Sequence, residues 1–92
     1  MFAVYILTST SNSVLYVGVT SRLKERVWQH KQHVTSGFTD RYNVEKLVYY
    51  EVFNDISSAI KREKQLKKWR RSWKNELITG FNRYWVDLYD DV

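Results

Sequence analysis

The chain begins with two short hydrophobic runs separated by a polar turn. Residues Phe2–Leu7 and Val14–Val19 are rich in β-branched and aromatic side chains, and the turn-forming stretch Ser9–Ser13 lies between them. This pattern predicts a β-hairpin. Because apolar residues occupy both faces of each run, we expect the sheet to be covered, at least in part, on both sides. In a symmetric hairpin, Tyr5 lies opposite Tyr16, with Cβ atoms about 5 Å apart.

The segment after the hairpin has the spacing of apolar residues that is typical of a helix. Thr20 and Ser21 are good N-cap residues for a helix. The side chains expected on its inward face recur three or four residues apart, and they are Leu23, Val27, His30 and Val34. After this helix we expect a loop over Ser36–Asn43 and a third strand over Lys46–Phe53, which is again rich in β-branched and aromatic residues.

The C-terminal half of the chain is mainly helical in pattern. Either Asn54 or Asp55 is expected to cap a second helix. The side chains expected on the buried face of that helix are Ile56, Ala59, Ile60 and Leu66. Trp69 and Trp73 begin a third helical segment, expected to end near Gly80. The order ββαβαα predicts a single α+β domain with a small three-stranded, mostly antiparallel sheet flanked by helices.

Composition narrows the class of protein. The 92 residues, of which 43% are hydrophobic and 16% aromatic, are enough for one folded domain. The absence of cysteine excludes a disulfide framework and a thiolate zinc site. The apolar runs are far shorter than the roughly 18 residues of a membrane span, so we expect a cytoplasmic protein with no membrane partner. The net charge of +5 favours a polyanionic partner, and simple solubility is the alternative.

Glu63 is an anomaly in the second predicted helix. On a helical wheel it falls among Ala59, Ile60 and Leu66, in the middle of the apolar stripe. A glutamate is almost never fully buried without a partner, so an inward carboxylate requires an arginine or a metal ion. The alternative is a glutamate at the edge of the stripe that pairs with Lys67, one turn further on.

A dense group of basic residues extends over Lys61–Lys74. It contains eight of the fifteen basic residues of the chain, and Glu63 is its only acid. Basic side chains with Trp69 and Trp73 between them suit phosphate contact combined with base stacking. The candidate nucleic-acid contacts are Lys61, Lys64, Lys67, Lys68, Arg70, Arg71 and Lys74. The alternatives are a solvated helix face and two tryptophans of the core.

Arg26 and His30 are four residues apart in the first predicted helix and therefore share a face. We expect them beside the hairpin tyrosines, Tyr5 and Tyr16. Hydrolysis of a phosphodiester needs a base for water, positive charge at the developing phosphate and help for the leaving oxygen. A tyrosine, with a reference pKa of about 10, acts as a base only if cations lower that pKa. Arg26 and a metal ion held by Glu63 would be such cations.

These residues resemble the pattern of the GIY-YIG endonuclease superfamily. Ala3-Val4-Tyr5 and Tyr16-Val17-Gly18 resemble its two signature tripeptides. Arg22–His30 is similar to its first helix, Ile60–Lys64 to its metal-ligand helix and Asn82 to its late asparagine. The resemblance covers almost the whole chain and points to the short, stand-alone bacterial branch of the superfamily. That branch is related to the nuclease domain of an excision-repair incision subunit and to intron-encoded endonucleases.

The resemblance implies a role for each matched residue. Tyr5 and Tyr16 would line the site, one as the general base and the other as a positioning or leaving-group donor, and Tyr5 is favoured as the base. Arg26 would stabilise the phosphate charge, with His30 assisting the phosphate or the tyrosine. Glu63 would be the sole protein ligand of one Mg²⁺ or Mn²⁺ ion, which otherwise keeps its waters.

The sequence departs from the family pattern at three positions. Ala3 replaces the first signature glycine, and Val19 stands where many members carry a lysine, so one cationic helper is lost. Asn82 would orient the site, and Arg83 follows it where a proline is common.

Three functions are compatible with the sequence. The favoured one is a metal-dependent endonuclease that cuts DNA, nonspecifically or directed by a branched or nicked structure, in repair or recombination. Sequence-specific cutting is not expected, because phosphate contacts carry no base information. The second is a catalytically weak nucleic-acid-binding module that uses the basic helix 61–74. The third is a domain whose positive face binds an acidic protein.

Overall fold

Three strands form one antiparallel sheet. The computed structural model describes residues 1–34 and 37–92. In it, β1 (Phe2–Ser9), β2 (Leu15–Thr20) and β3 (Val44–Phe53) are arranged in the order β2-β1-β3. The central strand is therefore β1, and β2 lies at an edge. The predicted α+β class and three-stranded sheet are confirmed, and every strand boundary lies within two residues of the prediction.

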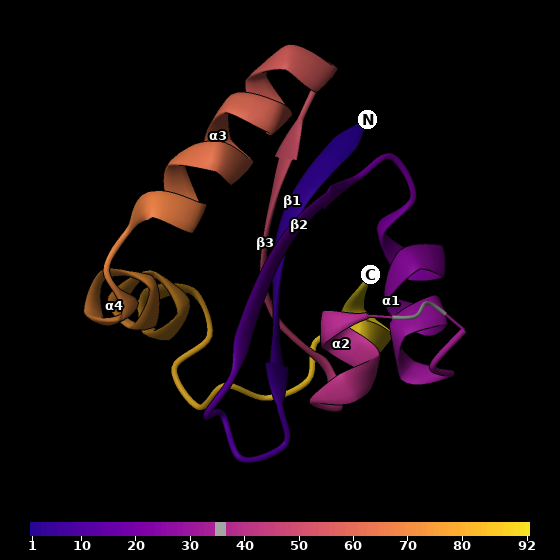
Figure 1. Cartoon of the computed structure of the whole chain (residues 1–92). Helices are drawn as coiled ribbons and strands as arrows, with labels where there is room; N and C mark the ends of the chain where they lie inside the picture. The colour runs from indigo at the N-terminus through magenta and orange to yellow at the C-terminus, as the bar shows by residue number, and fades with distance from the viewer. Residues whose placement is uncertain (35–36) are drawn as a thin grey trace.

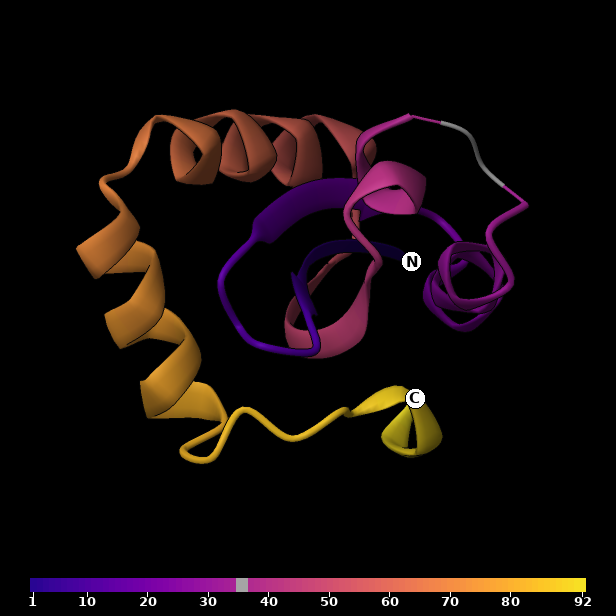
Figure 2. The same ribbon diagram turned by 60° about the horizontal axis from the view of Figure 1, so that its bottom comes forward.

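Helices lie on both faces of this sheet (Figures 1 and 2). On one face are α3 (Ile56–Lys68) and α4 (Arg71–Phe81). On the other are α1 (Leu23–Lys31), the short α2 (Phe38–Arg41) and a C-terminal 3-10 turn (Tyr89–Asp91). The expected covering of the sheet on both sides is confirmed.

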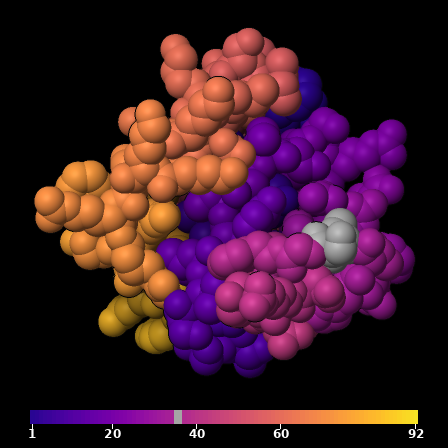
Figure 3. Space-filling view, viewed as in Figure 1, coloured from indigo at the N-terminus to yellow at the C-terminus, as the bar shows by residue number. Residues whose placement is uncertain are grey.

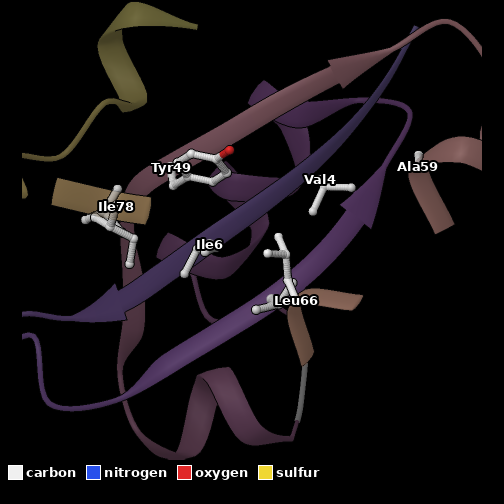
Figure 4. Close-up of a cluster of buried hydrophobic side chains, with 8 residues drawn as sticks. Val4, Ile6, Tyr49, Ala59, Leu66 and Ile78 are labelled. Carbon is white, nitrogen blue, oxygen red and sulfur yellow. The ribbon is translucent and has the colours of Figure 1, made fainter. Parts of the chain in front are cut away.

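The face under α3 and α4 holds the larger hydrophobic core. Successive side chains of a strand point to opposite faces, so alternate residues of β1 contact these two helices. The core side chains labelled in Figure 4 are Val4, Ile6, Tyr49, Ala59, Leu66 and Ile78. Burying a large aliphatic side chain contributes roughly 1.5–3 kcal/mol, so this contact holds α3 firmly against β1 and β2.

The opposite face buries a second cluster, which the C-terminal segment closes. Its buried members are Tyr5, Leu7, Val27, Val44 and Leu47. The backbone N–H of Leu88 donates to the carbonyl of Leu47 at 2.8 Å, and the Lys24 ammonium donates to the carbonyl of Tyr89 at 2.7 Å. The end of the chain therefore ties α1 to β3.

The start and end of α1 differ from the prediction. Its N-cap is Arg22, not Thr20 or Ser21, and no side chain caps it. The Thr20 hydroxyl accepts the backbone N–H of Arg22 at 3.0 Å, so it supports the turn before the helix. Because the helix ends at Lys31, Val34 does not lie on its inward face and is 61% exposed.

The start of α3 is as predicted, but its buried face is narrower. The Asp55 carboxylate caps the helix by accepting the backbone N–H of Ser58 at 2.8 Å. Ala59 is buried as expected, whereas Ile56 and Ile60 are 43% and 37% exposed. The face of α3 that contacts the sheet is therefore narrower than predicted, and it leaves Ile56 and Ile60 partly exposed to solvent.

Two further boundaries differ. Trp69 is the C-cap of α3 and does not belong to the next helix, which extends one residue past Gly80. Residues 38–41 form α2 within the segment predicted as the loop Ser36–Asn43. The beginning of that predicted loop, Ser36, lies outside the described residues.

Candidate active site

The hairpin turn sets the register of the two tyrosines. Asn12 adopts φ 62°, a left-handed conformation that asparagine tolerates, and the turn is centred one residue later than predicted. Tyr5 pairs with Gly18 and Tyr16 with Leu7, so the predicted direct opposition of the tyrosines is wrong. The pairing is shifted by two residues from the predicted one, since Tyr5 pairs with Gly18 instead of Tyr16. A shift by an even number of residues leaves each side chain on its original face, so both phenols still lie on one face of the sheet.

Gly18 provides the space that Tyr5 occupies. A Cβ at this glycine would lie 2.5 Å from both Cζ and the hydroxyl oxygen of Tyr5. Any side chain there would displace the ring. The Tyr5 ring therefore crosses over β2 and carries its hydroxyl towards the edge of the sheet. The sequence pattern included Gly18 in a tripeptide, but only the structure reveals this physical reason for it.

Tyr5 is enclosed and electrostatically coupled to two helices. The residue is 1% exposed. Burial raises the pKa of the Tyr5 phenol to about 12, opposed by a hydrogen bond and the positive charge of Arg26, while Tyr16 and Glu63 add to the increase. The prediction that cations would lower this pKa is therefore only partly correct, since burial outweighs the arginine. The groups that act on the pKa of Tyr5 come from β2, α1 and α3.

His30 faces the Tyr5 hydroxyl from α1. Its Nε2 lies 3.3 Å from the Tyr5 oxygen, and its Nδ1 lies 2.9 Å from the hydroxyl oxygen of Thr39 in α2. Burial, aided by the charge of Arg26, lowers the pKa of His30 to about 4. The imidazole is therefore neutral near pH 7. The buried Thr39 was not among the predicted site residues, although it fixes the ring from behind.

Tyr16 is the more accessible phenol. It is half-buried, and its ring centroid lies 6.3 Å from that of Tyr5 and 5.7 Å from that of His30. Phe38 of α2 stacks on its other side, with the centroids 6.3 Å apart. This contact also escaped sequence reasoning, because a predicted loop gave no reason to place Phe38 near the hairpin.

Arg26 lies on the same side of the sheet, on the helix that carries His30, and is half-buried. Its guanidinium donates to the side-chain oxygen of Gln29 at 3.1 Å. Beside it is an open polar cavity of about 230 Å³, lined by Thr20, Ser21, Arg22, Glu25, Arg26 and Gln29. The arginine is thus held between an enclosed phenol and a solvent-accessible hollow.

Glu63 reaches the site from the opposite side, on α3. Its side chain is 15% exposed, and the carboxylate forms an ion pair with the Lys67 ammonium at 3.1 Å. The predicted inward position and the alternative pairing with Lys67 are therefore both found. In the space-filling view, atoms of the hairpin are visible between α3 and the helices α1 and α2 (Figure 3). Glu63 and Arg26 approach Tyr5 from these two sides.

The donor set fits a hard divalent cation that retains most of its waters. No cluster of three or more His, Cys, Asp or Glu side chains occurs among residues 1–34 and 37–92, so a closed protein cage is not built there. Mg²⁺ is usually bound through one or two carboxylates together with waters and phosphate oxygens. The single carboxylate of Glu63, which is mostly buried, matches that requirement.

Asn82 is not brought to this group of side chains. It is buried, and its amide nitrogen donates to the carbonyls of Val48 and Val86 at 3.2 and 2.8 Å. The backbone N–H of Val86 donates back to its side-chain oxygen at 3.1 Å. These bonds fasten the segment after α4 to β3, and the role of Asn82 in orienting site residues stays a prediction.

The predicted basic surface divides into exposed and engaged residues. The exposed members are Lys61, Lys64, Lys67, Lys68, Arg70 and Arg71. Of these, Arg71 donates to the backbone carbonyls of Asn12 and Ser13 at 2.6 and 2.8 Å and therefore holds the hairpin turn against α4. Partial burial, aided by the charge of Arg71, lowers the pKa of Lys74. These two residues are less available to a polyanion than their neighbours.

The two tryptophans of this region also differ from each other. Trp69 is half-buried and packs against the core, as the core alternative predicted, whereas Trp73 is 47% exposed. Arg62, beneath the basic surface, stacks 5.1 Å from the Trp69 ring and pairs with Glu51. It therefore belongs to the core packing of α3.

No helix of the described residues is long and apolar enough to span a membrane.

Comparison with known proteins gives one consistent result. Residues 1–76 match the family of the GIY-YIG catalytic domain. A UPF0213 protein of Clostridium perfringens is 37% identical over 77 residues, covering 84% of this chain and 82% of its own length. One from Syntrophus aciditrophicus is 36% identical, over 82% of this chain and 86% of its own length. The solution structure of a UPF0213 protein from Bacillus halodurans superimposes with a TM-score of 0.54 and 26% identity, covering 86% of this chain and 84% of that one.

The family match and the arrangement of the tyrosines, the arginine and the glutamate agree on the class of protein. The match spans most of the chain, including every predicted site residue except Asn82. The chain belongs to the GIY-YIG family, whose catalytic domain is of the nuclease type and acts on nucleic acid.

Proposed function

We propose that this protein is a metal-dependent endonuclease that hydrolyses phosphodiester bonds in DNA. One observation carries the proposal: the charges of Arg26 on α1 and Glu63 on α3 both act on the buried Tyr5 phenol, although the two helices cover opposite faces of the sheet. A structural core gains nothing from collecting a phenol, a guanidinium and an incompletely neutralised carboxylate in this way. Hydrolysis of a phosphate ester uses all three.

Glu63 would hold the ion, in exchange for its present contact with Lys67. A bound Mg²⁺ or Mn²⁺ supplies positive charge to the phosphate and to the leaving oxygen. Lys67 is 51% exposed, so its ammonium is able to swing from the carboxylate to a phosphate of the incoming strand at little cost. Arg26 stabilises the charge that develops on the phosphate.

Tyr5 is the proposed general base, with His30 behind it. With a pKa of about 12, the isolated phenol keeps its proton at neutral pH. The neutral His30 imidazole, 3.3 Å from the Tyr5 oxygen, is placed to take that proton as the phenol oxygen accepts one from water. Tyr16, which is more accessible, positions the phosphate or donates to the leaving oxygen.

The exposed lysines of α3 bring the DNA to this site. Side chains of this kind contact phosphates, which give salt-dependent affinity without base readout. Cleavage is therefore nonspecific or directed by the structure of the DNA, for example a branch or a nick. Repair or recombination is the process to which such an activity belongs.

The proposal is tested by incubating the protein with plain, nicked and branched DNA in the presence of Mg²⁺ or Mn²⁺. We expect cleavage that EDTA abolishes. Glu63→Ala should not cut, whereas Glu76→Ala, which removes an exposed glutamate of α4, should cut normally. All three proteins should bind DNA equally in EDTA. Cleavage by Glu63→Ala at the wild-type rate, or cleavage that survives EDTA, would contradict the metal assignment.

A second candidate is a nucleic-acid-binding module with little catalysis. The observations in its favour are the Lys67 ammonium on Glu63 and the absence of a lysine at Val19. This candidate predicts tight, salt-sensitive DNA binding without cleavage under any of the metal conditions above.

A further inference from the structure

A second polar cavity lies at the other end of the molecule from α1, outside the candidate active site. It has a volume of about 350 Å³ and is open to solvent; its lining residues are Asn12, Arg71, Asn75, Arg83, Tyr84 and Trp85. They come from the hairpin turn, from α4 and from the segment that follows α4 (Figures 1 and 2). Two arginines and no acidic residue line it, so a negatively charged ligand is favoured.

Tyr84 is the most unusual side chain of this cavity. It is 77% exposed, which makes it one of the most exposed large hydrophobic residues of the chain. The Arg83 guanidinium lies 5.4 Å from its ring centroid, and the rest of the ring faces solvent. A tyrosine in the core contributes by burial, and this one does not. An aromatic face next to an exposed arginine suits a flat, anionic ligand.

The segment that presents Tyr84 is held in place by its neighbours. Trp85 has φ 54°, a left-handed conformation that is rare for a large aromatic residue. Its indole N–H donates to the hydroxyl of Thr79 at 2.9 Å, and its ring packs against the core. The Asn82 bonds to Val86, together with the bond from the backbone N–H of Trp85 to the carbonyl of Asn82, close a turn around residues 83 and 84. Arg83 and Tyr84 are therefore projected outward from a fixed turn.

Asn75 and Arg71 shape the floor of the cavity. The side-chain oxygen of Asn75 accepts the Nε–H of Arg71 at 3.0 Å, which turns the Asn75 amide nitrogen away from the arginine. The hydrogen bonds of Arg71 to the hairpin turn hold its guanidinium still while its charge remains. The cavity thus offers a fixed positive charge, an amide donor and an aromatic face, which are the groups that bind one nucleotide of a single strand.

We propose that this cavity binds a nucleotide of single-stranded DNA, with the base stacked on Tyr84 and a phosphate at Arg83. A duplex does not supply such a ligand, because its base faces are already stacked on each other. Arg83 and Tyr84, which supply the phosphate contact and the stacking face, lie beyond residues 1–76, the part of the chain that matches the family domain. The proposal depends on the proposed function only for DNA as the polymer, and it gives the nuclease a preference for substrates with an unpaired segment.

The test measures binding in EDTA, so that its outcome is independent of cleavage. A fluorescein-labelled single strand, the corresponding duplex and an RNA strand of the same sequence are titrated with the full chain and followed by anisotropy. The variant Arg83→Ala/Tyr84→Ala should bind the single DNA strand at least about tenfold more weakly, as expected for loss of one stacked base and one phosphate contact. Its affinity for the duplex should fall less than about threefold, the part that one lost charge explains.

The chain contains a matched control. Arg41 and Tyr42 form the same dipeptide at the end of α2, with the guanidinium 5.6 Å from the ring centroid and the tyrosine 45% exposed. Arg41→Ala/Tyr42→Ala makes the same change in charge and composition, and it should weaken single-strand binding by no more than about threefold. Equal losses in both variants, an equal loss on duplex, or a loss confined to RNA would overturn the proposal. Unchanged thermal unfolding of both variants is expected, since their side chains are exposed.

Discussion

The molecule contains two groups of one tyrosine, one arginine and one glutamate, whose tyrosines, Tyr49 and Tyr5, lie on opposite faces of the sheet. In the first, under α3, the Arg62 Nε–H lies 3.0 and 3.2 Å from the two oxygens of Glu51. The Tyr49 hydroxyl donates to the same carboxylate. Burial and this carboxylate raise the pKa of Tyr49. The hydrogen bonds and the ion pair among these three side chains satisfy the charge of the carboxylate, so the set offers no binding capacity to a ligand.

The second group, at the candidate active site, does not close on itself. Arg26 donates to Gln29 and lowers the pKa of Tyr5, while Glu63 forms its ion pair with the half-exposed Lys67. No ion pair joins Arg26 to Glu63 within the described residues. The same three residue types are thus structural where they neutralise one another and suited to catalysis where they are held apart. Because Arg26 and Glu63 do not neutralise each other, Arg26 is left to bind a phosphate and Glu63 to bind a metal ion.

The two arginines provide the largest expected contrast. Arg26→Ala should lower kcat/KM about 100-fold, which corresponds to about 3 kcal/mol of lost transition-state stabilisation, because a preorganised positive charge is removed. Arg62→Ala should leave kcat/KM per folded molecule within about threefold. Initial rates on a saturable DNA substrate measure both values. A loss below about fivefold for Arg26→Ala would place this arginine in the structural class.

Tyr5 lies beside the buried His30, and this contact should make the stability of the protein depend on pH. His30, beside Tyr5, has a pKa of about 4 in the folded protein and about 6.5 when unfolded. The unfolded state therefore binds the proton first, and the free energy of unfolding falls as pH drops from 6.5 towards 4. The loss is up to about 3 kcal/mol. Urea unfolding at pH 7 and pH 4 should show a smaller decrease for His30→Gln, and equal decreases would contradict the assignment.

The two glutamates should differ in their effect on stability. Glu51→Gln leaves the partly buried guanidinium of Arg62 without its carboxylate, and we expect a loss of about 2 kcal/mol in the free energy of unfolding. Glu63→Gln breaks only a pair with an exposed lysine, so the change should stay below about 1 kcal/mol. Urea denaturation compares the two variants. If Glu63→Gln proves as destabilising as Glu51→Gln, its carboxylate is part of the core packing.

The smallest effect concerns Lys67. Lys67→Met removes the ammonium that competes with a cation for Glu63, so Tb³⁺ should bind about threefold more tightly, in keeping with the small worth of an exposed pair. Luminescence sensitised by the nearby tyrosines follows the binding without any substrate. Lys68→Met makes the same change in charge one residue away and should leave the affinity unchanged. Identical titrations for the two variants would show that Lys67 does not guard Glu63.

Local patterns predicted most of the fold. The two hydrophobic runs of the hairpin, the end of the third strand at Phe53 and the cap of α3 at one of the two expected residues, Asp55, depend on residues close together in the chain, and the structure confirms each of them. The errors arose where a contact with another element decides the outcome. Ile56 and Ile60 fit a helical stripe, but the narrow sheet beneath α3 covers only part of it.

The candidate site was predictable in its components and not in its connections. Tyr5, Arg26, His30 and Glu63 all carried recognisable chemistry in the sequence. The partners Thr39 and Phe38 did not, because both lie in a segment that was read as a loop. Asn82 and Arg71 had the right residue types for function, yet their hydrogen bonds go to backbone carbonyls of other elements.

The sequence by itself determined which strands and helices form and which reactive groups are present, because hydrophobic spacing and residue chemistry act over a few positions. Only the tertiary structure decided how those groups meet: that Tyr5 lies across Gly18, that Glu63 is mostly buried beside Lys67, and that Arg71 holds a turn 58 residues away. Such pairings depend on distances between elements, which no local pattern encodes.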